Sequence, residues 1–106
     1  MKGEVVIIPF LFSDLSGAKR RPALVIADWG GDDIMLCQIT SKLKYDGYEI
    51  KLGDADFENG KLPVESHIRP NKIFTAHRNN IISTTGKISG SKYQMVIEQI
   101  INMISI

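Results

Sequence analysis

The chain joins a basic cluster directly to an apolar run in the stretch Ala18-Lys19-Arg20-Arg21-Pro22-Ala23-Leu24-Val25-Ile26. Proline has a locked φ that suits the first position of a strand but not its middle. We therefore expect a strand that starts at Pro22 and continues over Ala23–Ala27. A strand start is a rigid scaffold, so Arg21 should hold its guanidinium in a fixed place, as a phosphate-binding site requires.

Length and composition indicate one domain, spanning residues 1–106, with one hydrophobic core. The net charge of +1 gives no overall signal for nucleic-acid binding, so any such signal must be local. The single cysteine, Cys37, excludes an intramolecular disulfide and a cysteine-based zinc site, and it fits a reducing, cytoplasmic compartment. The apolar run Val5–Phe12 is too short to cross a membrane and contains Pro9, so we interpret it as a core strand.

Short apolar runs at regular intervals predict a mainly β protein with one closing helix, built as a strongly curved sheet or small barrel. Glycine and polar residues at 13–17 predict a turn, and the pair Asp46-Gly47 predicts a tight hairpin. The expected later elements are a strand at Ile34–Thr40, one or two strands over Val64–Phe74 broken at Pro70, and a helix capped by Ser89 or Ser91 with one apolar face formed by Tyr93, Val96, Ile97, Ile100, Ile101 and Ile104.

The motifs of most enzyme classes are missing, including a glycine-rich phosphate loop, a nucleophile elbow and paired histidines at metal-ligand spacing. What remains is a set of cations and hydroxyls: Lys19, Arg20, Arg21, Thr40, Ser41, Lys42, Ser66, Arg69 and Lys72. If the second and third strands pair antiparallel, Arg21 comes near Thr40. A guanidinium beside a hydroxyl can bind a phosphodiester and stabilise charge on a pentavalent phosphorus.

The order and spacing of several segments resemble the MazF/PemK toxin family over nearly the whole chain. These segments are Gly3-Glu4-Val5, Arg21–Ile26, Gln38-Ile39-Thr40-Ser41, Ser66–Ile73 and Gly86-Lys87-Ile88, followed by the terminal helix. The resemblance implies an SH3-like barrel with a C-terminal helix, of the kind shared by the PemK and CcdB toxins. It further implies a homodimer that cuts single-stranded RNA without a metal or other cofactor and is neutralised by a small antitoxin, with operator DNA bound through the antitoxin complex.

In the resemblance, Arg21 matches the catalytic arginine and Thr40 the catalytic threonine, while Ser66 lies in the stretch that lines the RNA groove. The other expected substrate-binding residues are Lys19, Arg20, Ser41, Lys42 and Lys72. The implied reaction is attack by the ribose 2′-hydroxyl on the adjacent phosphorus, which leaves a 2′,3′-cyclic phosphate and a 5′-hydroxyl. The chain departs from the commonest pattern at Phe74, where many relatives carry an arginine, and in a short loop before Arg21.

Other interpretations of the same residues stay open. A CcdB-like toxin would bind gyrase without cutting RNA, and an inactive member would bind only its antitoxin and DNA. His67 and His77 are spare acid–base candidates that are more often structural. Cys37 should be buried and inert, and Trp29 could stack a base, pack in a dimer contact or cover an end of the barrel.

Overall fold

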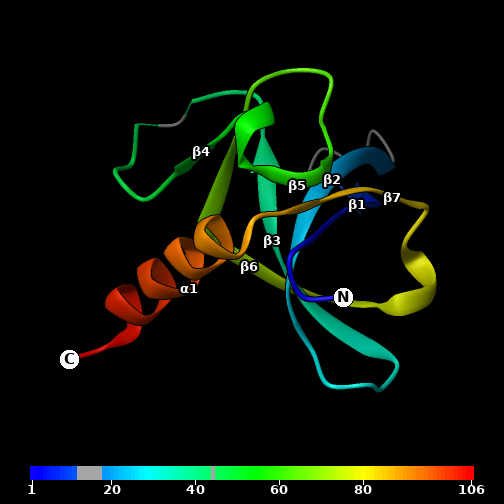
Figure 1. The fold of residues 1–106 in the computed structure, drawn as a ribbon. Helices are drawn as coiled ribbons and strands as arrows, with labels where there is room; N and C mark the ends of the chain where they lie inside the picture. Colours follow the sequence, from blue (N-terminus) through cyan, green and yellow to red (C-terminus); the bar gives the residue numbers. More distant parts are fainter. Residues whose placement is uncertain (12–17, 44) are drawn as a thin grey trace.

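A single antiparallel sheet of seven strands, strongly curled, forms most of the molecule (Figure 1). The computed structural model describes residues 1–11, 18–43 and 45–106, so the turn expected at 13–17 and the end of the first apolar run lie outside the described residues. The spatial order of the strands is β4-β6-β3-β2-β1-β7-β5. The elements are β1 (Glu4–Leu11), β2 (Ala18–Asp28), β3 (Asp33–Thr40), β4 (Ile50–Leu52), η1 (Asp54–Asp56), β5 (Phe57–Gly60), β6 (Ser66–His77), η2 (Arg78–Asn80), β7 (Ser83–Ile88) and α1 (Gly90–Ile104).

The central strands are buried on both faces because the sheet curls and α1 packs against it. Alternate residues of a strand point to opposite faces. Leu24 and Cys37 belong to a cluster that also contains Val96 of α1, whereas Ala23 and Leu36 belong to a second cluster. These observations confirm the expected mainly β architecture with a C-terminal helix.

Pro22 lies inside β2 and not at its start, so the expected strand boundary was wrong. β2 pairs with β1 from Ala18 onward, with Pro22 opposite Ile7, but its pairing with β3 begins only at Ala23. Pro22 therefore occupies a part of the strand with a neighbour on one side only, which is where a residue without an N–H is tolerated.

The expected hairpin at Asp46-Gly47 is also wrong. Asp46 does form a local turn, in which its Oδ1 accepts a hydrogen bond from the Tyr48 N–H at 3.0 Å, and Gly47 has a φ of 83°. However, β3 and β4 do not pair with each other, because β6 lies between them. Asp46, which lies between β3 and β4 in the sequence, contacts Arg69 and Asn71 of β6.

β6 is one long strand with an irregularity at the expected break. Cys37 of β3 lies opposite Ile73, but the next residue, Gln38, lies opposite Arg69. Residues 70–72 therefore bulge out of the ladder. Pro70 cannot donate to a ladder, so a bulge is a position that tolerates it.

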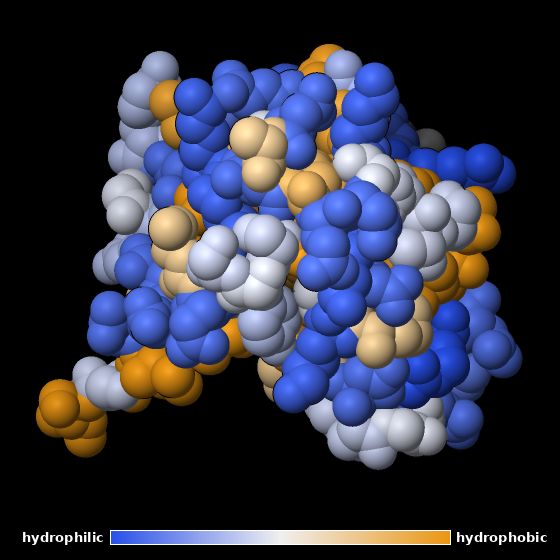
Figure 2. Space-filling view, viewed as in Figure 1, coloured by the Kyte–Doolittle hydropathy of each residue, from blue (hydrophilic) through white to orange (hydrophobic). Residues whose placement is uncertain are grey.

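The terminal helix begins as expected, with Ser89 as its cap. The Ser89 hydroxyl accepts a hydrogen bond from the Lys92 N–H at 3.2 Å, and the Tyr93 hydroxyl donates to the Ile26 carbonyl at 2.6 Å. On the expected apolar face only Val96 is buried, and Tyr93, Ile97 and Ile100 are partly buried against the core. Ile101 is 50% exposed and Ile104 is 75% exposed, because the end of α1 extends away from the sheet and carries apolar surface there (Figure 2).

Candidate functional site

A groove of about 770 Å³ opens at one end of the sheet. Its walls come from β1, the first half of β2, the end of β3 with the residues that follow it, β6, and the turn before β6. Polar and charged lining residues are Arg21, Gln38, Thr40, Ser41, Lys42, Ser66, Arg69 and Lys72. Six of the eight residues that the sequence singled out as site residues are among them.

The pairing of β2 with β3 brings Arg21 and Thr40 to one wall of this groove. Ala23 and Gln38 are the last paired residues of the two strands at this end. Arg21 and Thr40 each lie two residues beyond that pair, and both line the groove. Arg21 is exposed and Thr40 is half-buried.

The Thr40 hydroxyl is oriented by its own backbone. Its Oγ1 accepts a hydrogen bond from the Lys42 N–H at 3.1 Å. A hydroxyl has one donor and two acceptor positions, so this bond uses an acceptor position and leaves the O–H of Thr40 as a donor. A donor beside a guanidinium suits a non-bridging phosphate oxygen.

Ser66 is almost completely buried, with 3% of its surface exposed. Its hydroxyl donates to the Val64 carbonyl at 3.0 Å, which orders the turn before β6. Ser66 therefore helps to shape the groove by ordering this turn. Because its O–H donates to the backbone, only the acceptor positions of its oxygen are left for a ligand.

The remaining expected cations divide into two groups. Lys42 and Lys72 are exposed at the groove, Lys72 from the bulge in β6. Lys19 and Arg20 are exposed on β2, opposite Phe10 and Pro9 of β1, and are not among the described residues that line the groove.

Arg69 is a groove residue that sequence reasoning noted as a cation but did not assign to the site. Its Nη2 donates to Asp46 Oδ2 at 2.8 Å, and the Asn71 amide donates to the same oxygen at 3.0 Å. The neighbouring Glu49 carboxyl, the Tyr48 N–H, Asn71 and Arg69 together hold the pKa of Asp46 well below its usual range. In the sequence, Asp46 was the one signal for this pairing. Because Asp46 was interpreted as a hairpin residue, the pairing with Arg69 was not predicted.

Two aromatic rings close the apolar part of the groove. Phe10 and Phe74 meet edge to face, with ring centroids 4.7 Å apart and an interplanar angle of 66°. The lining at position 74 is therefore apolar, where the family pattern would supply a cation.

The other singled-out residues lie outside the groove. The His77 Nδ1 accepts a hydrogen bond from the Asn79 N–H at 3.0 Å at the start of η2, which is a structural role. Cys37 is buried, and burial raises the pKa of its thiol to about 12. Trp29 is 60% exposed on the turn between β2 and β3, at the opposite end of the sheet. Within residues 1–11, 18–43 and 45–106, no group of three or more metal-ligating side chains forms.

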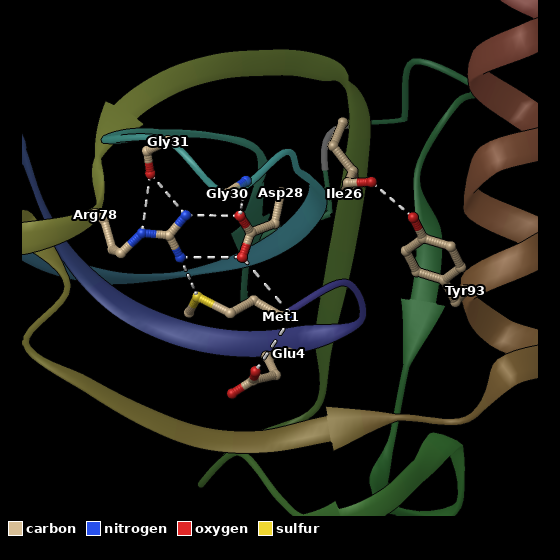
Figure 3. A network of polar contacts seen from close by, with 8 residues as sticks. All are labelled: Met1, Glu4, Ile26, Asp28, Gly30, Gly31, Arg78 and Tyr93. Carbon is tan, nitrogen blue, oxygen red and sulfur yellow. Dashed lines mark hydrogen bonds and ion pairs between the residues drawn. The ribbon is translucent and has the colours of Figure 1, made fainter.

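That opposite end of the sheet is fastened by a second polar cluster (Figure 3). Arg78 donates to both carboxylate oxygens of Asp28, at 2.6 Å and 3.0 Å, and from Nε and Nη2 to the Gly31 carbonyl, at 3.2 Å and 2.9 Å. The hydrogen bonds from Arg78 and from the Gly30 N–H hold the pKa of Asp28 well below its usual range. This cluster is far along the strands from the groove.

Comparison with known proteins gives one family match. The family model described as PemK-like, MazF-like toxin of type II toxin-antitoxin system matches residues 1–104. No curated protein sequence matches the chain. No helix in the described part of the chain has the length and apolar character needed to span a membrane.

Solved structures of similar fold share little sequence with this chain. A mycobacterial endoribonuclease in complex with its cognate antitoxin aligns with a TM-score of 0.78 and 12% identity, over 100% of this chain and 95% of that chain. The Mycobacterium tuberculosis toxin MazF-mt6 aligns with a TM-score of 0.73 and 19% identity, over 93% of each chain. A MazE-MazF structure from Deinococcus radiodurans aligns with a TM-score of 0.78 and 18% identity, over 99% of this chain and 95% of that chain.

Proposed function

Because the chain belongs to the PemK-like, MazF-like toxin family of type II toxin-antitoxin systems, we propose that it is an endoribonuclease that cuts single-stranded RNA without a metal ion. The observation that carries the proposal is the groove that Arg21 and Thr40 share across β2 and β3. A fixed cation and an oriented hydroxyl on one wall can both reach a single phosphodiester.

The proposed reaction uses the substrate's own nucleophile. The ribose 2′-oxygen forms a bond to the adjacent phosphorus while the bond from phosphorus to the 5′-oxygen breaks, and the proton of the 2′-hydroxyl is balanced by protonation of the leaving 5′-oxygen. The products are a 2′,3′-cyclic phosphate and a 5′-hydroxyl. No attacking water needs activation, so the chemistry does not require a metal-bound hydroxide.

Arg21 and Thr40 would act on the charge that develops in this step. The Arg21 guanidinium would stabilise the extra negative charge of the phosphorane, and the Thr40 O–H would donate to a non-bridging oxygen. An arginine side chain stays protonated in proteins and is a poor base, so the role of Arg21 is electrostatic. Ser41, Lys42, Ser66 and Lys72 would hold the flanking RNA, with Lys19 and Arg20 available to more distant phosphates.

The same proposal includes partners. A second copy of the chain would cover the exposed apolar end of α1, where Ile101 and Ile104 contact solvent. A cognate antitoxin would bind the chain, since an endoribonuclease of similar fold forms a complex with its own antitoxin. Operator DNA would be bound through the antitoxin complex, and the protein would act in the cytoplasm, where messenger RNA is found.

The test is to incubate the protein with single-stranded RNA in EDTA, beside Arg21→Ala and a 2′-deoxy copy of the same oligonucleotide. We expect cleavage of RNA in EDTA, no cleavage of the deoxy copy because it lacks the nucleophile, and loss of cleavage in Arg21→Ala. Intact RNA across several sequences would contradict the proposal, and retention of gyrase in a pull-down without RNA cleavage would replace it with a gyrase-binding toxin.

A further inference from the structure

Asp46 connects the two sides of the groove. It lies in the loop that follows Ser41 and Lys42, which are part of one wall, and it accepts hydrogen bonds from Arg69 and Asn71 of β6 at 2.8 Å and 3.0 Å. Arg69 is the last paired residue before the β6 bulge and Asn71 lies within the bulge, so the carboxylate holds the first half of the bulge. The loop and the bulge are thereby joined by one residue.

Arg69 keeps donors that this connection does not use. A guanidinium has five N–H donors, and the hydrogen bonds found among the described residues use one of them, from Nη2 to Asp46. The Arg69 Nε is buried and has no hydrogen-bond partner among the described residues, and the Arg69 side chain is 11% exposed. Buried donors without an acceptor are rare in folded proteins, so such a donor at a groove indicates an acceptor that arrives with the ligand.

The location of Arg69 indicates which acceptor that is. The residue lines the groove and lies opposite Gln38, which is two residues before Thr40 on the same strand. Arg69 and Thr40 are therefore about two residues apart along adjacent strands. In an extended nucleotide chain, the phosphate next to the one at Arg21 and Thr40 is the nearest anion.

We propose that Arg69 binds a backbone phosphate of the substrate next to the one that is cut, and that Asp46 is the residue that positions Arg69 for this task. The inference rests on the proposed function, because it takes the ligand to be single-stranded RNA. Asp46 is a positioning residue in this account and touches no substrate. Arg69 is a binding residue whose loss should weaken RNA binding and leave the chemical step intact.

The charge of Asp46 makes the proposal sharply testable. If Asp46 acted only through its negative charge, its removal from beside an anion-binding groove would strengthen RNA binding. If Asp46 positions Arg69, its removal should weaken RNA binding in spite of the more favourable charge. The Asp46→Asn variant keeps the shape and one acceptor oxygen, and therefore separates the two effects.

The experiment measures binding of an uncleavable 2′-deoxy oligonucleotide at several salt concentrations by fluorescence anisotropy. The variants are Arg69→Gln and Asp46→Asn, with Lys87→Gln as the control, since Lys87 is a cation on β7 outside the groove lining and paired with Glu58 at 3.8 Å. We expect Arg69→Gln to weaken binding about tenfold and to reduce the slope of log Kd against log salt by about 0.7, the value for one phosphate contact to a single strand. Asp46→Asn should weaken binding about threefold, and Lys87→Gln should match the wild type.

Cleavage kinetics give the second measurement. With cleavable RNA, Arg69→Gln should raise KM with little change in kcat, because it removes binding that is equal in the ground state and the transition state. Arg69→Lys keeps the charge but not the planar fork of donors, so it should retain the salt slope and lose affinity. That variant carries the test if Arg69→Gln does not fold.

Two outcomes would overturn the inference. Binding by Asp46→Asn that equals or exceeds that of the wild type would show that Asp46 does not position a binding group. An unchanged salt slope in Arg69→Gln would show that Arg69 touches no phosphate, and unchanged affinity in Arg69→Lys would show that binding does not depend on the donor geometry that Asp46 is proposed to position. If the wild type itself neither binds nor cuts RNA, the proposed function fails first, and the variants are not needed to show it.

Discussion

The cations at the two ends of the β2–β3 ribbon differ in how they are paired. At the turn end, the N–H donors of Arg78 are used within the protein. Both oxygens of Asp28, the Gly31 carbonyl and the Met1 sulfur accept hydrogen bonds from them (Figure 3). At the groove end, the exposed cations Lys42 and Lys72 have no ion pair within the described part of the chain.

This difference separates charge that holds the fold from charge that serves a ligand. An arginine whose donors all end on protein acceptors stabilises the segments that it connects, and in this case it fastens η2 to the β2–β3 turn. Cations gathered around a groove repel one another and are a cost to the folded chain until an anion arrives. Substitutions at the two ends should therefore have opposite effects on activity and on stability.

The largest expected effect is a crossed result for Arg21→Ala and Arg78→Ala. Arg21→Ala should lower the RNA cleavage rate by about a hundred- to a thousandfold, because it removes the main stabiliser of transition-state charge, with little change in Tm. Arg78→Ala should lower Tm by several degrees, because it leaves Asp28 half-buried without its partner. Cleavage by Arg78→Ala should remain close to that of the wild type well below its Tm.

The two variants should be measured side by side for single-turnover cleavage and for thermal unfolding. Equal losses of cleavage in both variants would indicate that the two ends are not functionally distinct. A large Tm decrease in Arg21→Ala would indicate that Arg21 also holds the fold.

A second prediction tests the role of the Thr40 hydroxyl at the groove end. Thr40→Val removes the hydroxyl and keeps the β-branched shape, so it should slow cleavage about tenfold, while Thr40→Ser should restore most of the rate. Single-turnover rates at saturating RNA test this expectation. Equal rates in the valine and serine variants would mean that the hydroxyl donates nothing to the phosphate.

The placement of Arg21 and Thr40 in one groove could be predicted from sequence, because their two strands are neighbours along the chain. Two strands joined by a short turn pair antiparallel, so the proximity of Arg21 to Thr40 followed from the spacing alone. The turn end could not be predicted in this way. Asp28 and Arg78 lie fifty residues apart in the sequence, and no local pattern links them.

The incorrect sequence predictions also concern features that depend on contacts between residues far apart in the sequence. Asp46-Gly47 has the composition of a hairpin and does turn locally, but β6 takes the place between β3 and β4 that a hairpin would have closed. Arg69 was hidden by this error, since its partner is the residue misread as part of a hairpin. The end of α1 follows a helical apolar period, but period alone does not show where the sheet stops, and Ile104 extends beyond it.

A third prediction concerns the response of the turn end to acid. The pKa of Asp28 is lower in the folded protein than its ordinary value, mainly because of its hydrogen bond to Arg78. Folding therefore favours the ionised form. The resulting stability is complete above the unfolded-state pKa of about 4 and is lost as the pH falls below it toward the folded-state value.

Asp28→Asn should be less stable than the wild type at pH 7 and should approach it as the pH falls from about 5 to about 2. Urea unfolding at a series of pH values measures this convergence. Asp46→Asn should lose a separate part of the acid response, because the pKa of Asp46 is lowered too. If the free energies of unfolding of Asp28→Asn and the wild type stayed parallel down to low pH, the Asp28–Arg78 ion pair would not be the source of the acid response.

The smallest expected effect compares two exposed cations on different strands, Lys72 of β6 and Arg20 of β2. Lys72 lines the groove, whereas Arg20, the immediate neighbour of Arg21, does not. Lys72→Gln should weaken binding of a 2′-deoxy oligonucleotide about threefold and lower the salt slope, while Arg20→Gln should change affinity by less than about twofold. Both residues are exposed, so neither substitution should disturb folding.

Binding isotherms at low salt measure the difference in affinity between the two variants, which is largest under that condition. If Arg20→Gln had the greater effect, the RNA would cross β2 outside the groove, and the division of the molecule into a ligand end and a fastened end would have to be redrawn around the strand that carries Arg20.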